Sequence, residues 1–142
     1  MLNVSGCEKL QSIPALEKFT KLAELDVSGC REIQGLPNVE YLTSLELLNV
    51  SGCGQLKSIP GLGQFTKLTE LYISGCLKIR EFLGAEHFIS LYMLDVGGCE
   101  KLDGIPRLGQ LTKLIDLNVQ GCSEMQELPG VEHLISLDKL NI

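Results

Sequence analysis

The six cysteines of this chain recur at one fixed spacing, and that spacing constrains the fold more than any other feature of the sequence. Each cysteine is followed by the next one 23 residues later. They are Cys7, Cys30, Cys53, Cys76, Cys99 and Cys122. A constant period of roughly 20–50 residues is typical of a solenoid, in which each repeat forms one coil and contacts only its neighbours. The sequence therefore predicts a stack of similar coils.

Apolar residues follow the same period at about every third position. Leu22, Leu25 and Val27 begin three columns that recur in every later repeat as Leu, Val or Ile. A second period of 46 residues is superposed, because segments 19–22, 65–68 and 111–114 resemble one another more than they resemble 42–45, 88–91 and 134–137. One coil cannot bury its own apolar ring, so the coils must stack. We expect a single solenoid over residues 1–142, with six 23-residue coils in three 46-residue double repeats and no terminal caps.

Each repeat contains a strand signal and a return segment. The alternation in Leu25-Asp26-Val27 predicts a short strand, and strands one coil apart must run parallel. Proline opens the return segment in five of the repeats, and the apolar spacing that follows suits a short helical or 3-10 turn. These prolines are Pro14, Pro37, Pro60, Pro106 and Pro129. The fourth coil reads Phe82-Leu83-Gly84-Ala85, with Leu83 in place of proline, so its return segment is expected to differ.

The repeat pattern Leu-x-x-Leu-x-Val-x-x-Cys-x-x-Ile/Leu-x-x-Ile/Leu-Pro resembles the leucine-rich repeat and covers essentially the whole chain. Its Ser-Gly-Cys-x-x-Leu-x-x-Ile-Pro variant is similar to the repeats of plant intracellular immune receptors that carry nucleotide-binding domains. Cysteine-type repeats of other eukaryotic families, protozoan ones included, are close alternatives. The resemblance implies an α/β solenoid that is right-handed, with a parallel inner β-sheet, short helical, 3-10 or irregular convex segments, and a concave face that binds proteins.

The cysteine spacing also bears on thiol chemistry. In this stack each cysteine occupies the position where many leucine-rich repeats place Asn, so the thiol should turn inward and donate weakly to a neighbouring carbonyl. Steps of 23 residues along a ladder do not bring thiolates into the tetrahedral arrangement that zinc requires. We therefore expect six reduced, slowly reacting thiols rather than disulfides or a metal site, no cofactor, and a cytoplasmic location.

Composition argues against several classes of function. The net charge of −6 disfavours a nucleic-acid groove, which needs clustered Lys and Arg. No apolar run approaches the roughly 18–20 residues that cross a bilayer. Catalysis requires a unique constellation of residues, whereas the serines before Gly-Cys recur with the repeat. The sequence predicts a protein that is not an enzyme.

The informative positions are the strand residues that alternate with the core residues and therefore point away from it. Some of these positions are apolar: Leu47, Tyr72, Tyr92, Met93 and Ile115. Others are acidic: Glu24, Asp26, Glu70, Asp95 and Asp116. An apolar centre with a charged rim is typical of a protein-binding hot spot. Random drift is the alternative, since scattered apolar surface residues are ordinary.

Two functions follow from this pattern. The first is a protein-interaction module, the ligand-sensing or regulatory repeat region of a larger intracellular receptor of the plant-defence type, whose protein partner carries a basic surface. The second is a structural or engineered array that self-associates end to end, without a dedicated partner. The second rests on the chain beginning and stopping inside a strand pattern, at 2–4 and 140–142.

Overall fold

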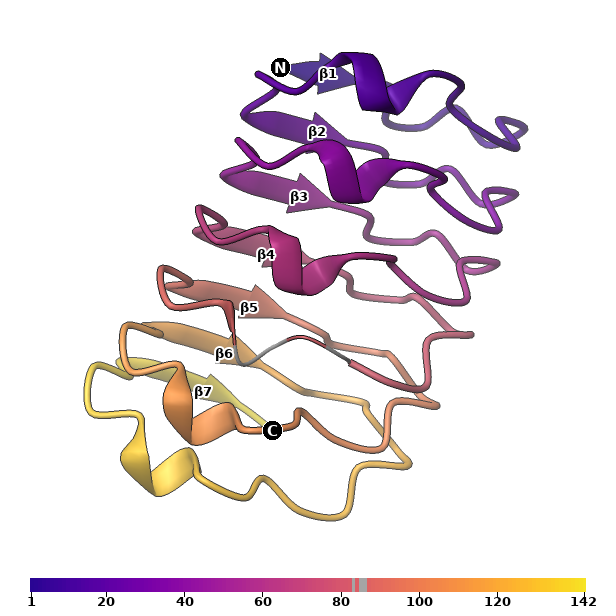
Figure 1. Cartoon of the computed structure of the whole chain (residues 1–142). Helices are drawn as coiled ribbons and strands as arrows, with labels where there is room; N and C mark the ends of the chain where they lie inside the picture. Colours follow the sequence, from indigo (N-terminus) through magenta and orange to yellow (C-terminus); the bar gives the residue numbers. More distant parts are fainter. Residues whose placement is uncertain (83, 85–86) are drawn as a thin grey trace.

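The computed structural model describes residues 1–82, 84 and 87–142. Its coils follow one another in chain order, with strands along one side of the stack and short turns along another (Figure 1). In this part of the chain the strands form one parallel sheet in sequence order. They are β1 (Leu2–Asn3), β2 (Glu24–Asp26), β3 (Leu47–Asn49), β4 (Glu70–Tyr72), β5 (Met93–Asp95), β6 (Asp116–Asn118) and β7 (Lys139–Asn141). The predicted solenoid with a parallel inner sheet is confirmed.

Strand register follows the sequence period. Leu25 pairs with Leu48, and Leu48 pairs with Leu71, so each core column of the sequence is one row of the sheet. Past each strand the chain turns sharply at the glycine before the cysteine, where φ lies between +68° and +77°. Side chains rarely adopt that conformation, which is why glycine stands there in every coil. The same glycine N–H closes the ladder, as in the 2.7 Å bond from Gly29 N to Ser51 O.

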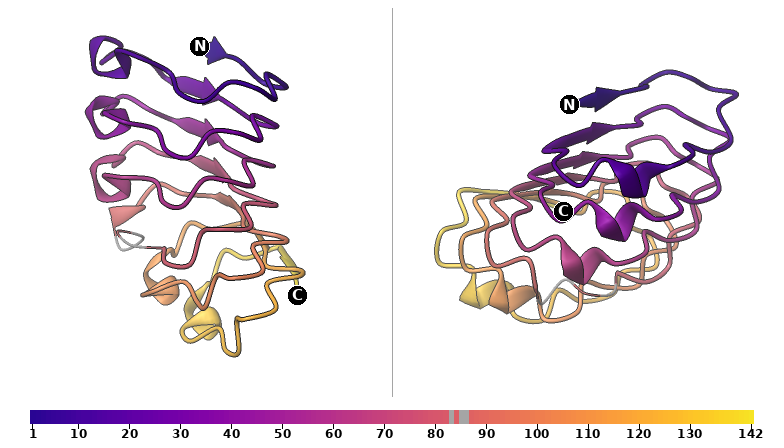
Figure 2. Two further views of the ribbon diagram at one scale, coloured as in Figure 1. Left: turned by 90° about the vertical axis from the view of Figure 1, so that its right-hand side faces the viewer. Right: turned by 45° about the horizontal axis from the view of Figure 1, so that its top comes forward.

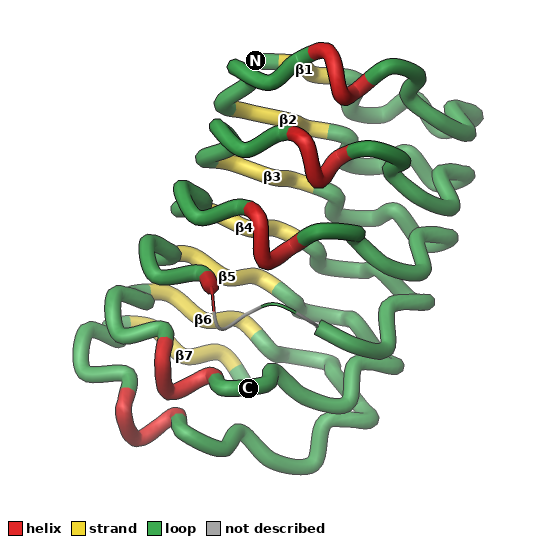
Figure 3. Tube along the Cα trace, viewed as in Figure 1, coloured by secondary structure: helices red, strands yellow, loops and turns green. Residues whose placement is uncertain are grey.

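The described return segments contain the predicted 3-10 turns, which lie along the side away from the strands (Figures 2 and 3). Each begins after a residue in the left-handed region, such as Ala15 or Asn38. They are η1 (Leu16–Lys18), η2 (Val39–Tyr41), η3 (Leu62–Gln64), η5 (Leu108–Gln110) and η6 (Val131–His133). The expectation of a divergent fourth coil concerns Leu83 and Ala85, which lie outside the described residues.

The core is a continuous apolar column through the stack. Leu25, Leu48, Leu71, Leu94 and Leu117 are fully buried, and no polar or charged residue of the described part of the chain is buried with them. The bulkiest buried side chains lie in the middle coils, where Phe82 and Phe88 meet edge to face with ring centroids 5.9 Å apart. Aromatic pairs favour this edge-to-face arrangement.

The cysteines form the predicted ladder, with one exception. Each thiol from Cys30 to Cys122 is buried and donates to a carbonyl 26 residues earlier, as in the 3.2 Å bond from Cys53 Sγ to Val27 O. Burial raises the pKa of Cys53 to about 11 and that of Cys99 to about 12. The prediction of six inward thiols is wrong for Cys7, which is exposed at the first coil of this structure. All six cysteines lie in the described residues, and all six are free of disulfides.

Candidate interaction surface

One surface of the solenoid is formed by the strand side chains that point away from the core. Strand pairing aligns them into columns, because Glu70 on β4 lies beside Met93 on β5 and Tyr72 lies beside Asp95. A third column precedes the strands, and its backbone continues the ladder through bonds such as Ile115 N to Tyr92 O at 2.9 Å. We call these three columns the sheet face. They begin at Ala23, Glu24 and Asp26 and recur every 23 residues.

The ten residues singled out from the sequence all lie on the sheet face. Tyr92 and Ile115 are 38% and 45% exposed, and Glu24 is also exposed. The remaining seven are half-buried between side chains of neighbouring coils: Asp26, Leu47, Glu70, Tyr72, Met93, Asp95 and Asp116. None of them belongs to the core. The structure therefore gathers these side chains on one solvent-accessible surface.

A hydrogen-bonded cluster occupies the middle of the sheet face. The Glu70 carboxylate accepts a 2.7 Å hydrogen bond from the Tyr72 hydroxyl at Oε2 and another of 2.7 Å from the Tyr92 hydroxyl at Oε1. Tyr72 ends β4, and Tyr92 directly precedes β5 on the next coil. Burial and the bond to Glu70 raise the pKa of Tyr72, while the bond to Glu70 is the main cause of the raised pKa of Tyr92. Both phenols thus stay protonated donors over a wide pH range.

The sheet face is strongly acidic. Its three columns contain seven carboxylates, and the one basic side chain is Lys139 on β7. Lys139 Nζ lies 3.6 Å from Asp116 Oδ2. Within the described residues no Lys, Arg or His forms an ion pair with Glu46, Glu70 or Asp95. Negative charge that the chain itself does not neutralise therefore surrounds the tyrosine cluster, and such a field attracts a cationic partner.

One column of the sheet face has a structural task that the sequence did not reveal. Asp26, Asn49, Asp95 and Asn118 each accept a hydrogen bond from the backbone N–H two residues later, at 2.9 to 3.1 Å. Asn118 Nδ2 also donates to Asp95 Oδ1 at 2.8 Å. Such Asx turns fix the exits of these strands. Asp26 and Asp95, which the sequence suggested as rim acids, therefore also hold the turn.

Tyr72 interrupts this column. The phenol oxygen of Tyr72 lies at the end of a long ring, too far from its own backbone to accept from the N–H of Ser74 as the short Asn and Asp side chains do in the neighbouring coils. Tyr72 instead directs its hydroxyl to Glu70 on the same strand. At Tyr72 an aromatic group therefore stands on the surface where the other coils have a side chain that closes the turn.

The described residues contain no group of three or more His, Cys, Asp or Glu side chains that could hold a metal ion. Across the same residues, no helix has the length and apolar character needed to cross a membrane.

No protein-family model and no curated protein sequence matches the chain. Solved structures do match it. The functional domain of InlJ from Listeria monocytogenes, described as including a cysteine ladder, aligns with a TM-score of 0.64 and 20% identity. The chain has the leucine-rich-repeat fold. The leucine-rich repeat domain of the type III effector XopL aligns with a TM-score of 0.65 and 21% identity.

The match covers 96% of this chain and 37% of the InlJ chain, and 91% of this chain and 55% of the XopL chain. The chain thus spans about a third to a half of the structures it resembles. Leucine-rich-repeat solenoids generally act as binding modules and present an extended surface to other proteins. The finer resemblance to plant immune receptors is not among these matches and stays a prediction.

Proposed function

We propose that the sheet face binds a protein with a basic surface and that Glu70, held between Tyr72 and Tyr92, is the centre of contact. The observation that carries this proposal is the interruption at Tyr72. Tyr72 stands at a position where five other coils use an Asn or Asp side chain, Asn3 included, to close the strand exit. Tyr72 breaks a column of turn-closing Asn and Asp residues at the centre of the sheet face, and such a break favours a role in binding over random variation.

The chemistry of the cluster fits a cationic side chain of the partner. Both phenol hydrogens are donated to Glu70, but neutral donors leave the carboxylate charge in place. A carboxylate has about four lone-pair sites, so Glu70 can also accept from an arginine or lysine of the partner. The two aromatic rings offer faces for cation–π contact, and Met93 supplies apolar area beside them.

Three further points belong to this proposal. The module serves as the ligand-sensing or regulatory repeat region of a larger intracellular receptor. The Ser-Gly-Cys-type repeat supports the plant-defence type of receptor, and the buried thiols support a reducing, cytoplasmic location. The module acts by binding and not by catalysis, which the repetition of its polar residues supports.

The test is the double variant Tyr72→Ala/Met93→Ala. Its matched control is Tyr41→Ala/Ile89→Ala, which removes two exposed apolar side chains from outside the sheet face. Proteins captured by the wild-type chain are titrated calorimetrically with both variants. We expect the sheet-face variant to lose more than about 1 kcal/mol of binding free energy and the control to lose none. The association rate should also fall as salt rises, because steering by opposite charges is screened.

Unchanged affinity in the sheet-face variant contradicts the proposal. Light scattering over a dilution series of the isolated chain tests the alternative function. Concentration-dependent growth without any captured partner would favour a self-associating array.

A further inference from the structure

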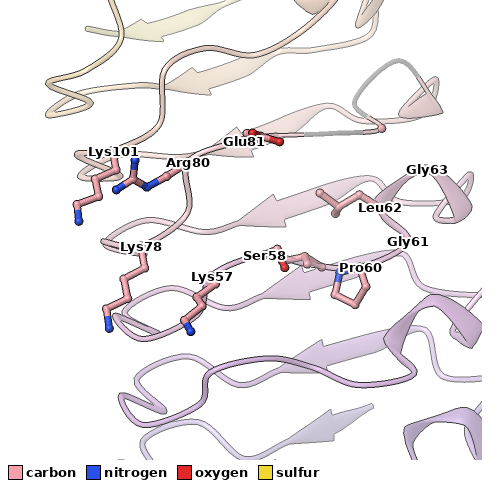
Figure 4. A pocket seen from close by; sticks show the side chains of 12 residues that line it. Lys57, Ser58, Pro60, Gly61, Leu62, Gly63, Lys78, Arg80, Glu81 and Lys101 are labelled. Atoms are coloured by element: carbon pink, nitrogen blue, oxygen red, sulfur yellow. The ribbon is translucent and has the colours of Figure 1, made fainter.

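A recess lies on the outer side of the stack, between the residues that follow the strand exits of the third to fifth coils and the 3-10 turn η3 (Figure 4). Its volume is about 750 Å³, within the range of about 300–1,000 Å³ that is usual for ligand sites. Lys57, Lys78, Arg80 and Lys101 gather at one end, as Figure 4 shows. Pro60 and Leu62 line the other end, beside backbone that carries no side chains at Gly61 and Gly63. We call this feature the basic recess.

The cations of the basic recess form no ion pair with the described part of the chain, although Arg80 and Lys101 also line a neighbouring hollow with Glu81, Asp103 and Glu124. Lys78 Nζ donates to the neutral Gln55 side chain. Glu81 is the one acid among the described residues that line the recess. Four clustered cations are unexpected in a chain whose net charge is −6.

The same recess recurs 46 residues later with the opposite charge. A recess of about 540 Å³ is lined there by Asp103, Ile105, Pro106, Glu124 and Gln126. These positions correspond to Lys57, Ile59, Pro60, Lys78 and Arg80 in the double repeat. The apolar residues are kept, and the charged ones are reversed or neutralised. The fold therefore builds the recess without requiring its cations.

We propose that the basic recess binds an extended acidic segment of another protein. Carboxylates of the segment lie against Lys57, Lys78 and Arg80, and an apolar side chain next to them packs on Pro60 and Leu62. A small oligophosphate would use the cations but not the apolar end, and for that reason a peptide is the better fit. The proposal is independent of the sheet face, since the two surfaces share no residue.

Three variants test this proposal with a fluorescein-labelled peptide, Asp-Glu-Leu-Asp-Glu-Leu, followed by anisotropy. The first, Lys57→Asp/Lys78→Glu/Arg80→Gln, installs the residues found at the equivalent positions of the acidic recess. The second, Lys9→Asp/Lys18→Glu/Lys21→Gln, changes the net charge by the same amount at exposed positions of the first coil. The third, Asp103→Lys/Glu124→Lys/Gln126→Arg, makes the acidic recess basic.

We expect the first variant to weaken peptide binding about tenfold or more, as loss of three exposed charge contacts implies. The second should weaken it by less than about threefold, since distant exposed charges are screened. The third should raise the stoichiometry from one peptide to two, a gain that misfolding cannot produce. Equal weakening by the first two variants, or no second site in the third, overturns the proposal. Binding of tripolyphosphate without binding of the peptide overturns it in favour of a small anion.

Discussion

The two sides of each strand share one backbone but differ in how far their residues vary from coil to coil. On the inner side, Leu25 and its equivalents are the same residue in every coil, and they are fully buried from Leu25 to Leu117. On the outer side, the column that starts at Glu24 continues with Leu47, Glu70, Met93, Asp116 and Lys139. Burial against the next coil restricts the residue type on the inner side, whereas almost any side chain can stand in solvent on the outer side. The variable positions are therefore where function can be placed.

Between these extremes lies the column of Asp26, Asn49, Asp95 and Asn118. It faces outward, yet its residues repeat because each one closes a turn. Exposure alone thus does not separate functional from structural residues. The useful distinction is whether the backbone of the same coil uses the side chain.

The largest contrast should appear in thiol reactivity. Cys7 and Cys76 occupy the same position of the repeat, but Cys7 is exposed and Cys76 is buried. A buried thiol reacts only after local opening, and burial also raises the pKa of Cys76. We expect Cys7 to react with a maleimide at least about 1,000-fold faster than Cys76 in the folded protein. Time-resolved labelling read by peptide mass spectrometry measures both rates.

The five buried thiols from Cys30 to Cys122 should make stability depend on pH at the alkaline end. Their pKa values are higher in the folded chain than the ordinary value of 9.0. The folded state therefore disfavours the thiolate. The contribution of these thiols to the free energy of unfolding is complete below pH 9 and is lost as the pH rises from there. Rapid labelling of several ladder cysteines in the native state, or no loss of stability up to pH 11, would contradict the closed ladder.

The next contrast is in core packing. Leu71→Ala removes a fully buried side chain from the middle of the stack, and we expect it to lower the free energy of unfolding by about 2–5 kcal/mol. Ile115→Ala, on the sheet face and 45% exposed, should change it by less than about 0.5 kcal/mol. Urea unfolding followed by circular dichroism measures both. Similar losses in the two variants would mean that the sheet face is packed like the core.

The sequence predicted most of the fold because the solenoid depends on periodic burial, and periodic burial is visible in the spacing of Leu25, Val27 and Cys30. It could not show that Cys7 is exposed, since that cysteine has the same local sequence context as the others. It also missed the bonds from Tyr72 and Tyr92 to Glu70, which depend on side-chain reach between coils. The basic recess escaped notice for a similar reason, because Lys57, Lys78 and Lys101 meet only when the coils are stacked.

The smallest change in stability is expected for Tyr72→Asn, which tests whether a side chain on the outer side of a strand serves structure or binding. Tyr72→Asn restores the residue type that closes the turn in the neighbouring coils, so its side-chain oxygen can accept from the N–H of Ser74. That gain offsets the lost ring contacts and the lost bond to Glu70, each worth about 1 kcal/mol. We therefore expect the free energy of unfolding to change by less than about 1 kcal/mol in either direction, measured by urea unfolding.

Binding should respond quite differently to Tyr72→Asn. The partner loses an aromatic contact whose worth we put at more than about 1 kcal/mol, and calorimetry should detect that loss in a chain that is as stable as before. A loss of several kcal/mol of stability would show that the tyrosine cluster holds the stack together. Retained affinity would show that the ring is not an anchor. Only an equally stable chain with weakened binding fits the proposal that Tyr72 serves binding and not the stability of the fold.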